Sequence, residues 1–222
     1  MNKKVFFSEK KYGSWTLGRG DDERIRQIVN LIGKNKVVLD IGCGIGEIGQ
    51  LLIKNKNKVY GLDISPTAVK KAKGKGLIVK CCDIEKEGIP FENNYFDAVL
   101  AAEVIEHIFD TDGFLEEIRK KLKKKGELII TTPNLATLGR KLLLLLGKNP
   151  LVETGLTRYS AGHIRYFVKD SLFKLIKSYK FKITYFSSDL VNFTADGRIN
   201  SRLLAKFFPT LGRTLILKAI KK

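Results

Sequence analysis

Two glutamates and two histidines are the side chains of this sequence best suited to moving a proton or holding a cation. Glu103, Glu106 and His107 lie close together in the chain, and His163 is the only other histidine. If residues 103–107 are helical, positions i, i+3 and i+4 share one face, so both carboxylates and the imidazole converge. Such a group can hold a divalent cation, although Mg²⁺ usually prefers more oxygen ligands. A histidine base without a metal and a purely structural role are the other interpretations.

A second constellation is built from glycines in the stretch Val37–Glu47. Its first five residues form an apolar run that predicts a strand buried on both faces, and a new apolar pattern begins at Ile48. The glycines stand at alternate positions: Gly42, Gly44 and Gly46. Glycine lets the backbone turn sharply and lie against a ligand. Because backbone N–H groups point outward where a helix begins, the stretch predicts a binding site for a small molecule.

Alternating strands and helices must position these residues. Apolar runs predict strands at 37–41, 59–63, 77–81, 96–102 and 127–132. Helical patterns fall at 21–32, 47–54, 66–73 and 112–122, and Gly126 is expected to end the last of them. This alternation predicts a mostly parallel, doubly wound α/β sheet with helices on both faces. Ligands of such sheets bind beyond the carboxyl ends of the strands, so one crevice is expected to be lined by Gly42, Asp63, Asp83, Glu103 and Asn134.

The alternation breaks over residues 135–168, which contain the unbroken leucine run Leu142–Leu146. A packing helix explains this run, and so does a lid that meets an apolar substrate or a membrane surface. Beyond it we expect a helix at 170–178 capped by Asp170, and strands at 181–186 and 214–220 that pair antiparallel at the sheet edge. The chain is interpreted as a single domain over residues 1–222, with an N-terminal helical cap region at 1–35 and an inserted lid or substrate region at 135–168.

The glycine turn alone does not identify its ligand. Gly44-x-Gly46-x-x-Gly49, with Asp63 about 20 residues further on, fits a dinucleotide such as NAD. Asp40 precedes the glycines, where it would repel a pyrophosphate but suits the cationic amino and sulfonium groups of S-adenosylmethionine. The position of this acid therefore favours S-adenosylmethionine.

Several motifs in order resemble those of the class I S-adenosylmethionine-dependent methyltransferases, from about residue 36 onward. They are Leu39–Gly46, Gly61–Ser65, Asp83, Tyr95–Glu103 and Leu122–Ile130, the last with Glu127 as a modest departure. The resemblance implies a Rossmann-like, seven-stranded sheet in the order 3-2-1-4-5-7-6, with strand 7 antiparallel. It also implies that Asp63 holds the ribose hydroxyls, that Asp83 holds the adenine amino group, and that the glycine turn admits the methionine part. The cofactor-binding set that it implies is Asp40, Gly42, Cys43, Gly44, Gly46, Asp63, Ile64, Asp83, Ile84, Ala102 and Glu103.

The acidic and histidine cluster resembles two metal-dependent branches of that family. These are the ubiquinone-pathway O-methyltransferases and the small-RNA 3′-terminal 2′-O-methyltransferases. The resemblance implies a divalent cation such as Mg²⁺ held by Glu103, Glu106, His107 and His163. Family members with no known metal also carry Glu-His at this point, so His107, His163 and Glu106 are equally candidates for metal-free catalysis.

Charge and hydropathy bear on the acceptor and the location. The formal net charge is +18, which fits nucleic acid or an anionic membrane, although lysines at helix ends also complement helix dipoles. A small, lipid-linked or sugar-linked hydroxyl acceptor is the first expectation, and an RNA acceptor is the alternative. An NAD-binding oxidoreductase and a non-catalytic nucleotide-binding module are candidates of other classes. Lacking a long apolar run or a secretion signal, the chain is expected to be cytoplasmic, with peripheral membrane contact an option.

Cys43, Cys81 and Cys82 are expected to be small buried residues.

Overall fold

The computed structural model describes residues 21–150, 162–193 and 199–222. The remaining parts of the expected N-terminal region and of the 135–168 insert lie outside the described residues. Within the described part, no helix has the length and apolar character that crossing a membrane requires.

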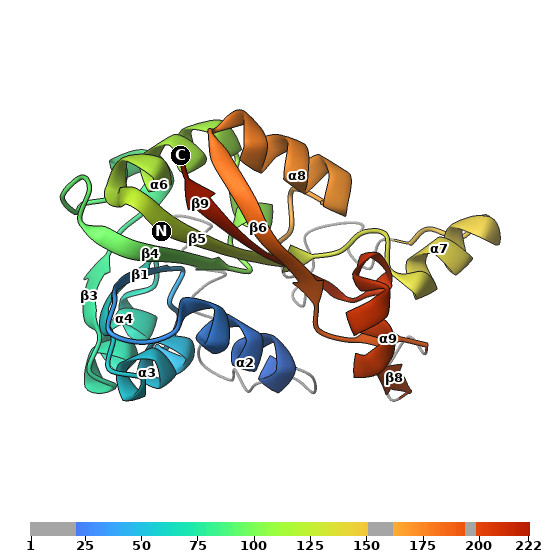
Figure 1. Ribbon diagram of the computed structural model, residues 1–222, viewed down its shortest axis with the longest axis horizontal. Coiled ribbons are helices and arrows are strands. Elements are labelled where there is room, and N and C mark those ends of the chain that lie inside the picture. The colour runs from blue at the N-terminus through green and yellow to red at the C-terminus, as the bar shows by residue number, and fades with distance from the viewer. Residues whose placement is uncertain (1–20, 151–161, 194–198) are drawn as a thin grey trace.

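A seven-stranded sheet forms the centre of the molecule (Figure 1). Its strands are β1 (Val37–Ile41), β2 (Lys58–Asp63), β3 (Ile78–Cys81), β4 (Phe96–Ala102), β5 (Leu122–Pro133), β6 (Phe181–Ser188) and β9 (Thr214–Lys221). Their order is β3-β2-β1-β4-β5-β9-β6, and β9 runs antiparallel to both of its neighbours. The expected order is confirmed, because β9 is the seventh strand of this sheet along the chain.

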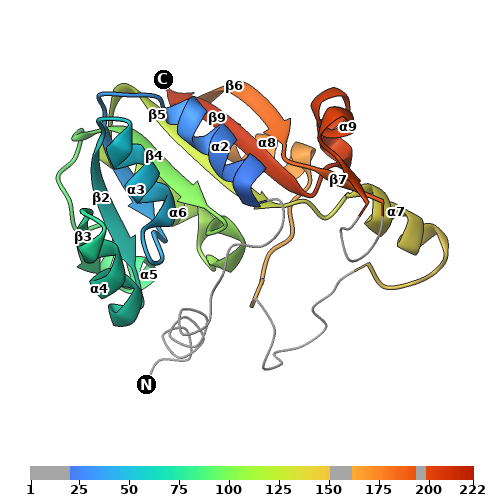
Figure 2. The same ribbon diagram turned by 90° about the horizontal axis from the view of Figure 1, so that it is seen from below.

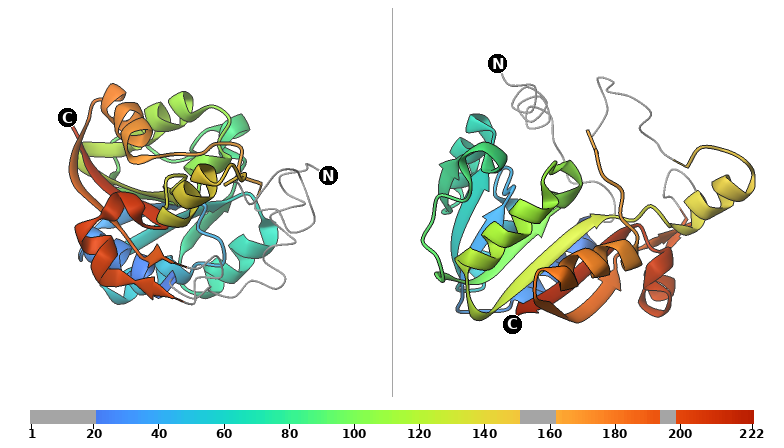
Figure 3. Two further views of the ribbon diagram at one scale, coloured as in Figure 1. Left: turned by 90° about the vertical axis from the view of Figure 1, so that its right-hand side faces the viewer. Right: turned by 90° about the horizontal axis from the view of Figure 1, so that it is seen from above.

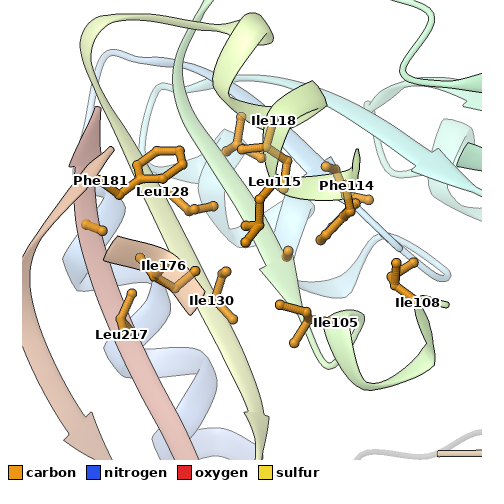
Figure 4. Packing of buried hydrophobic residues seen from close by; sticks show 14 of the residues in the cluster. Ile105, Ile108, Phe114, Leu115, Ile118, Leu128, Ile130, Ile176, Phe181 and Leu217 are labelled. Carbon is orange, nitrogen blue, oxygen red and sulfur yellow. The ribbon is translucent and has the colours of Figure 1, made fainter. Parts of the chain in front are cut away.

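Helices cover both faces of the sheet, as expected. On one face lie α2 (Asp21–Ile32), α3 (Glu47–Lys54) and α4 (Pro66–Gly74), as Figure 2 shows. On the other lie α6 (Thr111–Lys121) and α8 (Lys169–Ser178), seen in front of the sheet in the right view of Figure 3. Alternate residues of each strand point to opposite faces, so the sheet contributes to two separate hydrophobic clusters. Figure 4 shows the α6 and α8 cluster, which includes Leu115, Ile118, Leu128, Ile130 and Ile176.

Local sequence signals explain where several helices begin. The Ser65 hydroxyl accepts the Ala68 N–H at 3.0 Å, and Pro66 occupies the first turn of α4. Asp110 accepts from the N–H of Gly113 at the start of α6. The helix α5 (Ile84–Glu87) begins directly after Asp83. The Ser65 and Asp110 caps fix the loops that follow the carboxyl ends of β2 and β4, whereas Asp83 makes no side-chain cap bond to α5.

Two expected boundaries are wrong. Helix α6 ends at Lys121 and β5 begins at once with Leu122, so Gly126 lies inside the strand instead of ending the helix. The β4–β5 register jumps between Phe96–Leu122 and Ala98–Glu127, so the intervening residues bulge outward. Asp170 does not cap α8 but lies in its first turn, where an acid suits the helix dipole, and the Ser171 hydroxyl accepts from the Val168 N–H.

The leucine run makes up the second half of the helix α7 (Leu138–Leu145) and its C-cap, Leu146. Helix α7 extends away from the sheet near α9 (Arg202–Phe207) (Figure 1). No residue of α7 is buried, so the packing-helix interpretation is wrong. Two short strands, β7 (Val191–Asn192) and β8 (Asn200–Ser201), pair nearby. These strands and α9 were not predicted.

Candidate functional site

The expected site residues gather at the carboxyl edge of the parallel strands. Gly42 follows β1, Asp63 ends β2, Asp83 lies just beyond β3, and Glu103 follows β4. The β1–β2 and β2–β3 registers pair Ile41 with Leu62 and Asp63 with Cys81, so these strand ends lie side by side. The topology therefore gives one common edge for the residues that follow the strands.

The turn after β1 depends on its three glycines. The φ values of Gly42, Gly44 and Gly46 are +67°, +52° and +78°, in a backbone region that residues with a Cβ adopt only at an energetic cost. A Cβ on Gly42 would also lie 2.6 Å from a methyl carbon of Val104. The Cys43 N–H donates to the Leu62 carbonyl at 2.9 Å, which ties the turn to the end of β2. Gly46 precedes the first turn of α3, so the turn leads directly into a helix N-terminus.

Asp63 is held rigidly at the centre of this edge. One carboxylate oxygen accepts the Gly44 N–H and the other accepts the Ser65 N–H, each at 2.9 Å. The side chain is buried, so both bonds are shielded from water. The glycine turn and the loop after β2 are thereby fixed relative to one another by a single carboxylate.

Asp40 and Cys43 form a buried pair of titratable groups behind the turn. Burial, and secondly the charge of Asp63, raise the pKa of Asp40 to about 8. Burial also raises the pKa of the Cys43 thiol well above its usual range, with Asp40 and Asp63 adding to the effect. Cys43 is therefore a protonated packing residue. It packs against Gly61, where an added Cβ would lie 2.8 Å from the Cys43 sulfur.

Asp83, Ile64 and Ile84 lie partly exposed beyond β2 and β3, where the expected adenine slot would lie. The Asp83 carboxylate is 3.6 Å from the Lys86 ammonium, and its backbone N–H donates to Glu87. Ala102 ends β4 and is also partly exposed. Of the neighbouring cysteines, Cys82 is buried as expected, whereas Cys81 is exposed, contrary to expectation. Burial raises the pKa of the Cys82 thiol to about 11.

Asn134 has a structural role and does not line the crevice. Its side chain is buried, and its amide donates to the carbonyls of Thr210 and Gly212 at 3.0 and 2.8 Å. Its carbonyl oxygen accepts the Ala136 N–H. Asn134 therefore ties the end of β5 to the loop before β9.

Glu106, His107 and His163 come together at the end of β4. Each contributes a ligand atom, and these atoms all lie within 4.8 Å of one another. Oxygen Oε1 of the fully buried Glu106 is 4.0 Å from Nε2 of His107 and 3.9 Å from Nε2 of His163. Its other oxygen accepts the Thr132 hydroxyl at 3.0 Å. The two imidazoles are partly exposed, so one buried carboxylate oxygen faces two histidines at the protein surface.

The backbone of residues 162–167 brings His163 to this position. The N–H groups of Ile164 and Arg165 both donate to the Glu106 carbonyl, at 3.0 and 3.1 Å. The Arg165 guanidinium donates to the carbonyls of Ile108 and Phe109. Phe167 is buried and forms a bridge with Asn134 at the end of β5. This segment is therefore anchored directly on the C-terminal side of His163.

The hydrogen bond of His107 fixes its tautomer. Its Nδ1 lies 3.2 Å from the Gly162 carbonyl, which can only accept, so Nδ1 carries a proton. The lone pair of the neutral ring is then on Nε2, the nitrogen that faces Glu106. A histidine that donates one N–H to a carbonyl and presents the other nitrogen is arranged as metal-ligating histidines are.

Glu103 lies outside this group, because residues 103–107 do not form the helix that would place both carboxylates on one face. Only Ile105–His107 form a 3₁₀ turn, and Glu103 has a left-handed φ of +56°. Its carboxylate accepts the Thr131 hydroxyl at 2.9 Å and lies 3.7 Å from the Arg24 guanidinium. Thr131 and Thr132 are consecutive in β5, so their side chains point to opposite faces of the sheet. The carboxylates of Glu103 and Glu106, which accept from these two hydroxyls, therefore lie on opposite faces of the sheet.

Arg24, Thr131 and Thr132 were missed from the sequence. Arg24 is a buried cation that reaches the end of β4 from α2. The two threonines end the fifth strand, where period-two alternation alone could have assigned them to different faces. No comparable local signal indicated that Arg24 would pair with Glu103.

Comparison with known proteins identifies the family of the chain. A family model described as a methyltransferase domain matches residues 32–158. An uncharacterised protein of Methanocaldococcus jannaschii is 30% identical over 207 residues, covering 90% of this chain and 88% of that protein. The ubiquinone biosynthesis O-methyltransferase of Pelagibacter ubique is 35% identical over 104 residues, covering 46% of this chain and 43% of that enzyme. The match thus spans less than half of that enzyme's length.

Solved structures share the fold. The magnesium protoporphyrin IX methyltransferase of Synechocystis, determined with bound S-adenosylhomocysteine, has a TM-score of 0.63 at 16% identity, over 100% of this chain and 95% of that one. A possible histamine N-methyltransferase of Thermotoga maritima has a TM-score of 0.64 at 19% identity, over 99% and 94%. At such identities these similarities show the fold alone.

Proposed function

The chain belongs to the class I S-adenosylmethionine-dependent methyltransferases, and we propose that it methylates a hydroxyl oxygen of a small, lipid-linked or sugar-linked acceptor. The observation that carries this proposal is the buried Glu106 oxygen facing Nε2 of both His107 and His163 at the carboxyl edge of the sheet. A hydroxyl is a poor nucleophile until its proton is weakened, and this cluster can take that proton. The similarity to ubiquinone biosynthesis O-methyltransferases supports an oxygen acceptor.

We propose that the glycine turn and the acids around it hold the methyl donor. Its sulfonium supplies an already activated methyl group, so the protein must mainly align donor and acceptor. The Asp63 carboxylate is fixed by two backbone N–H bonds and retains acceptor capacity for ribose hydroxyls. Asp83 would receive the adenine amino group between Ile64 and Ile84, and the glycines would admit the methionine part to the backbone.

The cluster has the chemistry to hold a divalent cation. Two ligands bound at about 2.1 Å to one ion lie at most about 4.2 Å apart, and the two Glu106–histidine distances of 3.9 and 4.0 Å fall within that limit. Without Glu103 the set offers two nitrogens and one carboxylate, which suits Zn²⁺ or Mn²⁺ better than Mg²⁺. Glu106, His107 and His163 would hold the ion, which would supply Lewis acidity toward the acceptor oxygen.

The same residues can also act without a metal. The His107 lone pair on Nε2 can accept the hydroxyl proton, and the adjacent Glu106 carboxylate stabilises the imidazolium that results. Metal analysis of the purified protein, and transfer assays with and without EDTA, distinguish the two mechanisms. Activity that is lost in EDTA and restored by Zn²⁺ or Mn²⁺ assigns the metal mechanism, whereas full activity in EDTA assigns the base.

A methyl-label transfer screen tests the function itself. The full chain is incubated with labelled S-adenosylmethionine and with phenols, polyprenyl-linked sugars, free sugars and small RNAs. Labelled product from a hydroxyl compound supports the proposal. Label recovered only in RNA would replace it with the RNA alternative, which the net charge of +18 favours. Calorimetric titration with S-adenosylhomocysteine and NAD tests the remaining classes, since binding of NAD alone would exclude the transferase.

A further inference from the structure

Exposed apolar side chains are concentrated on one side of the molecule. Of the fifteen large hydrophobic side chains exposed in the described residues, ten lie in 142–146 and 193–208. The first group is the leucine run of α7, and the second is Phe193, Ile199, Leu203, Phe207 and Phe208. Leu145 is 82% exposed and Phe207 is 69% exposed. Side chains of this size are rarely left in water together without a partner.

The two groups lie on elements that both contact β7, and together they are here called the leucine face. Helix α7 contacts β7, α9 contacts β7 as well, and the Phe193 N–H donates to the Ile199 carbonyl. The left view of Figure 3 shows α7 and α9 on the same side of the molecule. Because α7 follows the carboxyl end of β5, this face lies at the same edge of the sheet as the glycine turn and Glu106.

Basic residues border the leucine face, and the exposed lysines among them carry the argument, since Arg213 pairs with Asp189 and Arg202 lies 3.8 Å from Glu23. Residues 138–149 and 199–213 contain no Asp or Glu, but they contain six basic residues: Arg140, Lys141, Lys148, Arg202, Lys206 and Arg213. The lysines among them are exposed. An apolar surface bordered by lysines is complementary to an anionic bilayer, where leucines enter the acyl boundary and lysines meet the headgroups.

We propose that the leucine face docks on the surface of an anionic lipid bilayer. A second copy of this chain fits less well, because a twofold interface would bring Lys141, Lys148 and Lys206 of both copies together. Docking holds the carboxyl edge of the sheet, where the glycine turn and Glu106 lie, near the headgroups, where lipid-linked acceptors are found. The inference does not rest on the identity of the methyl acceptor, because docking is measurable without methyl donor or acceptor.

Vesicle co-sedimentation of the full chain tests the proposal. The chain should sediment with vesicles in which about a quarter of the lipid is phosphatidylglycerol, and should remain in solution with pure phosphatidylcholine. The variant Leu144→Glu/Leu145→Glu should lower the partition coefficient about tenfold or more, because the acyl boundary rejects the carboxylates. These side chains are exposed, so the thermal unfolding midpoint should match that of the parent chain.

A matched pair of charge variants separates docking from general attraction. Lys141→Ala/Lys148→Ala removes two charges beside the leucine face, and Lys70→Ala/Lys73→Ala removes two exposed charges on α4. The first should weaken vesicle binding about tenfold or more, and the second should change it less than about twofold. Equal losses from both pairs would overturn the proposal. So would unchanged binding of the double glutamate variant, or a dimer in sedimentation velocity that this variant dissociates.

Discussion

The buried carboxylate of Glu106 is the residue whose replacement discriminates best between functional and structural interpretations. Gln keeps its shape and can still pair with Thr132, but it cannot accept a proton or neutralise a cation. We expect Glu106→Gln to lower kcat about 100-fold or more while leaving binding of S-adenosylhomocysteine within a few-fold. The Glu117→Gln variant on the surface of α6 is the control and should retain activity. Equal activity in the two variants would show that Glu106 takes no part in transfer.

Asp40 predicts an unusual dependence of stability on pH. Its pKa is raised from 3.8 to about 8, so the folded chain retains a proton that the unfolded chain loses near pH 4. The contribution of Asp40 to the free energy of unfolding is therefore full below about pH 4, falls as pH rises, and levels off above about pH 8. The slope in this window is at most about 1.4 kcal/mol per pH unit.

Replacement of Asp40 by Asn should remove that slope. Denaturant unfolding between pH 5 and 8 should show the Asn variant gaining stability relative to the parent chain as pH rises. The exposed Asp22→Asn variant is the control and should follow the parent chain. Parallel curves for Asp40→Asn and the parent chain would show that Asp40 is ionised throughout.

At the level of elements, strand β5 carries two neighbouring threonines on opposite faces of the sheet, one beside Glu106 and one beside Glu103. Thr132→Val deletes the hydroxyl that donates to Glu106 and should lower kcat about tenfold and move the acidic limb of the pH–rate profile. Thr131→Val is the same substitution on the opposite face, next to Glu103 and Arg24. It should alter KM for S-adenosylmethionine and leave the pH–rate profile in place. A shifted profile in Thr131→Val would contradict the separation of the two faces.

The glycine turn makes a second prediction at this level. Gly42→Ala combines a left-handed φ with a Cβ 2.6 Å from Val104, so it should cost on the order of 1–3 kcal/mol of stability and weaken donor binding. Gly139→Ala is the control, because its Cβ would meet open space within α7. It should be neutral or stabilising by about 0.5–1 kcal/mol. Thermal unfolding and calorimetric titration measure both effects.

How much the sequence could predict depended on how local the signal was. The strand at 37–41 and the helix at 47–54 have the predicted bounds, since apolar runs and a glycine turn are properties of neighbouring residues. The proximity of His107 and His163 was expected only through the family resemblance. The direction of Glu103 was missed because it depends on Arg24 and Thr131, which lie far away in the chain. The predicted start of strand β5, at residue 127, is too late, because the bulge that precedes it is set by pairing with β4.

For the whole molecule, ligand binding should appear as added stability. S-adenosylhomocysteine that binds only the folded chain should raise the free energy of unfolding by about 2.7 kcal/mol at a hundred times its Kd. The unfolding midpoint should rise with ligand concentration, whereas NAD at the same concentrations should leave it unchanged. A rise with NAD and none with S-adenosylhomocysteine would contradict the assignment of the donor.

The position of β9 has a consequence for how the protein is made. This strand lies between β5 and β6 in the sheet but follows both of them in the chain. On the ribosome, β6 therefore has no neighbouring strand to pair with, and β5 keeps one open edge, until residues 214–221 have emerged from the exit tunnel. Unpaired strand edges are sites of aggregation, so the nascent chain is most dependent on chaperones during the interval between synthesis of β6 and of β9.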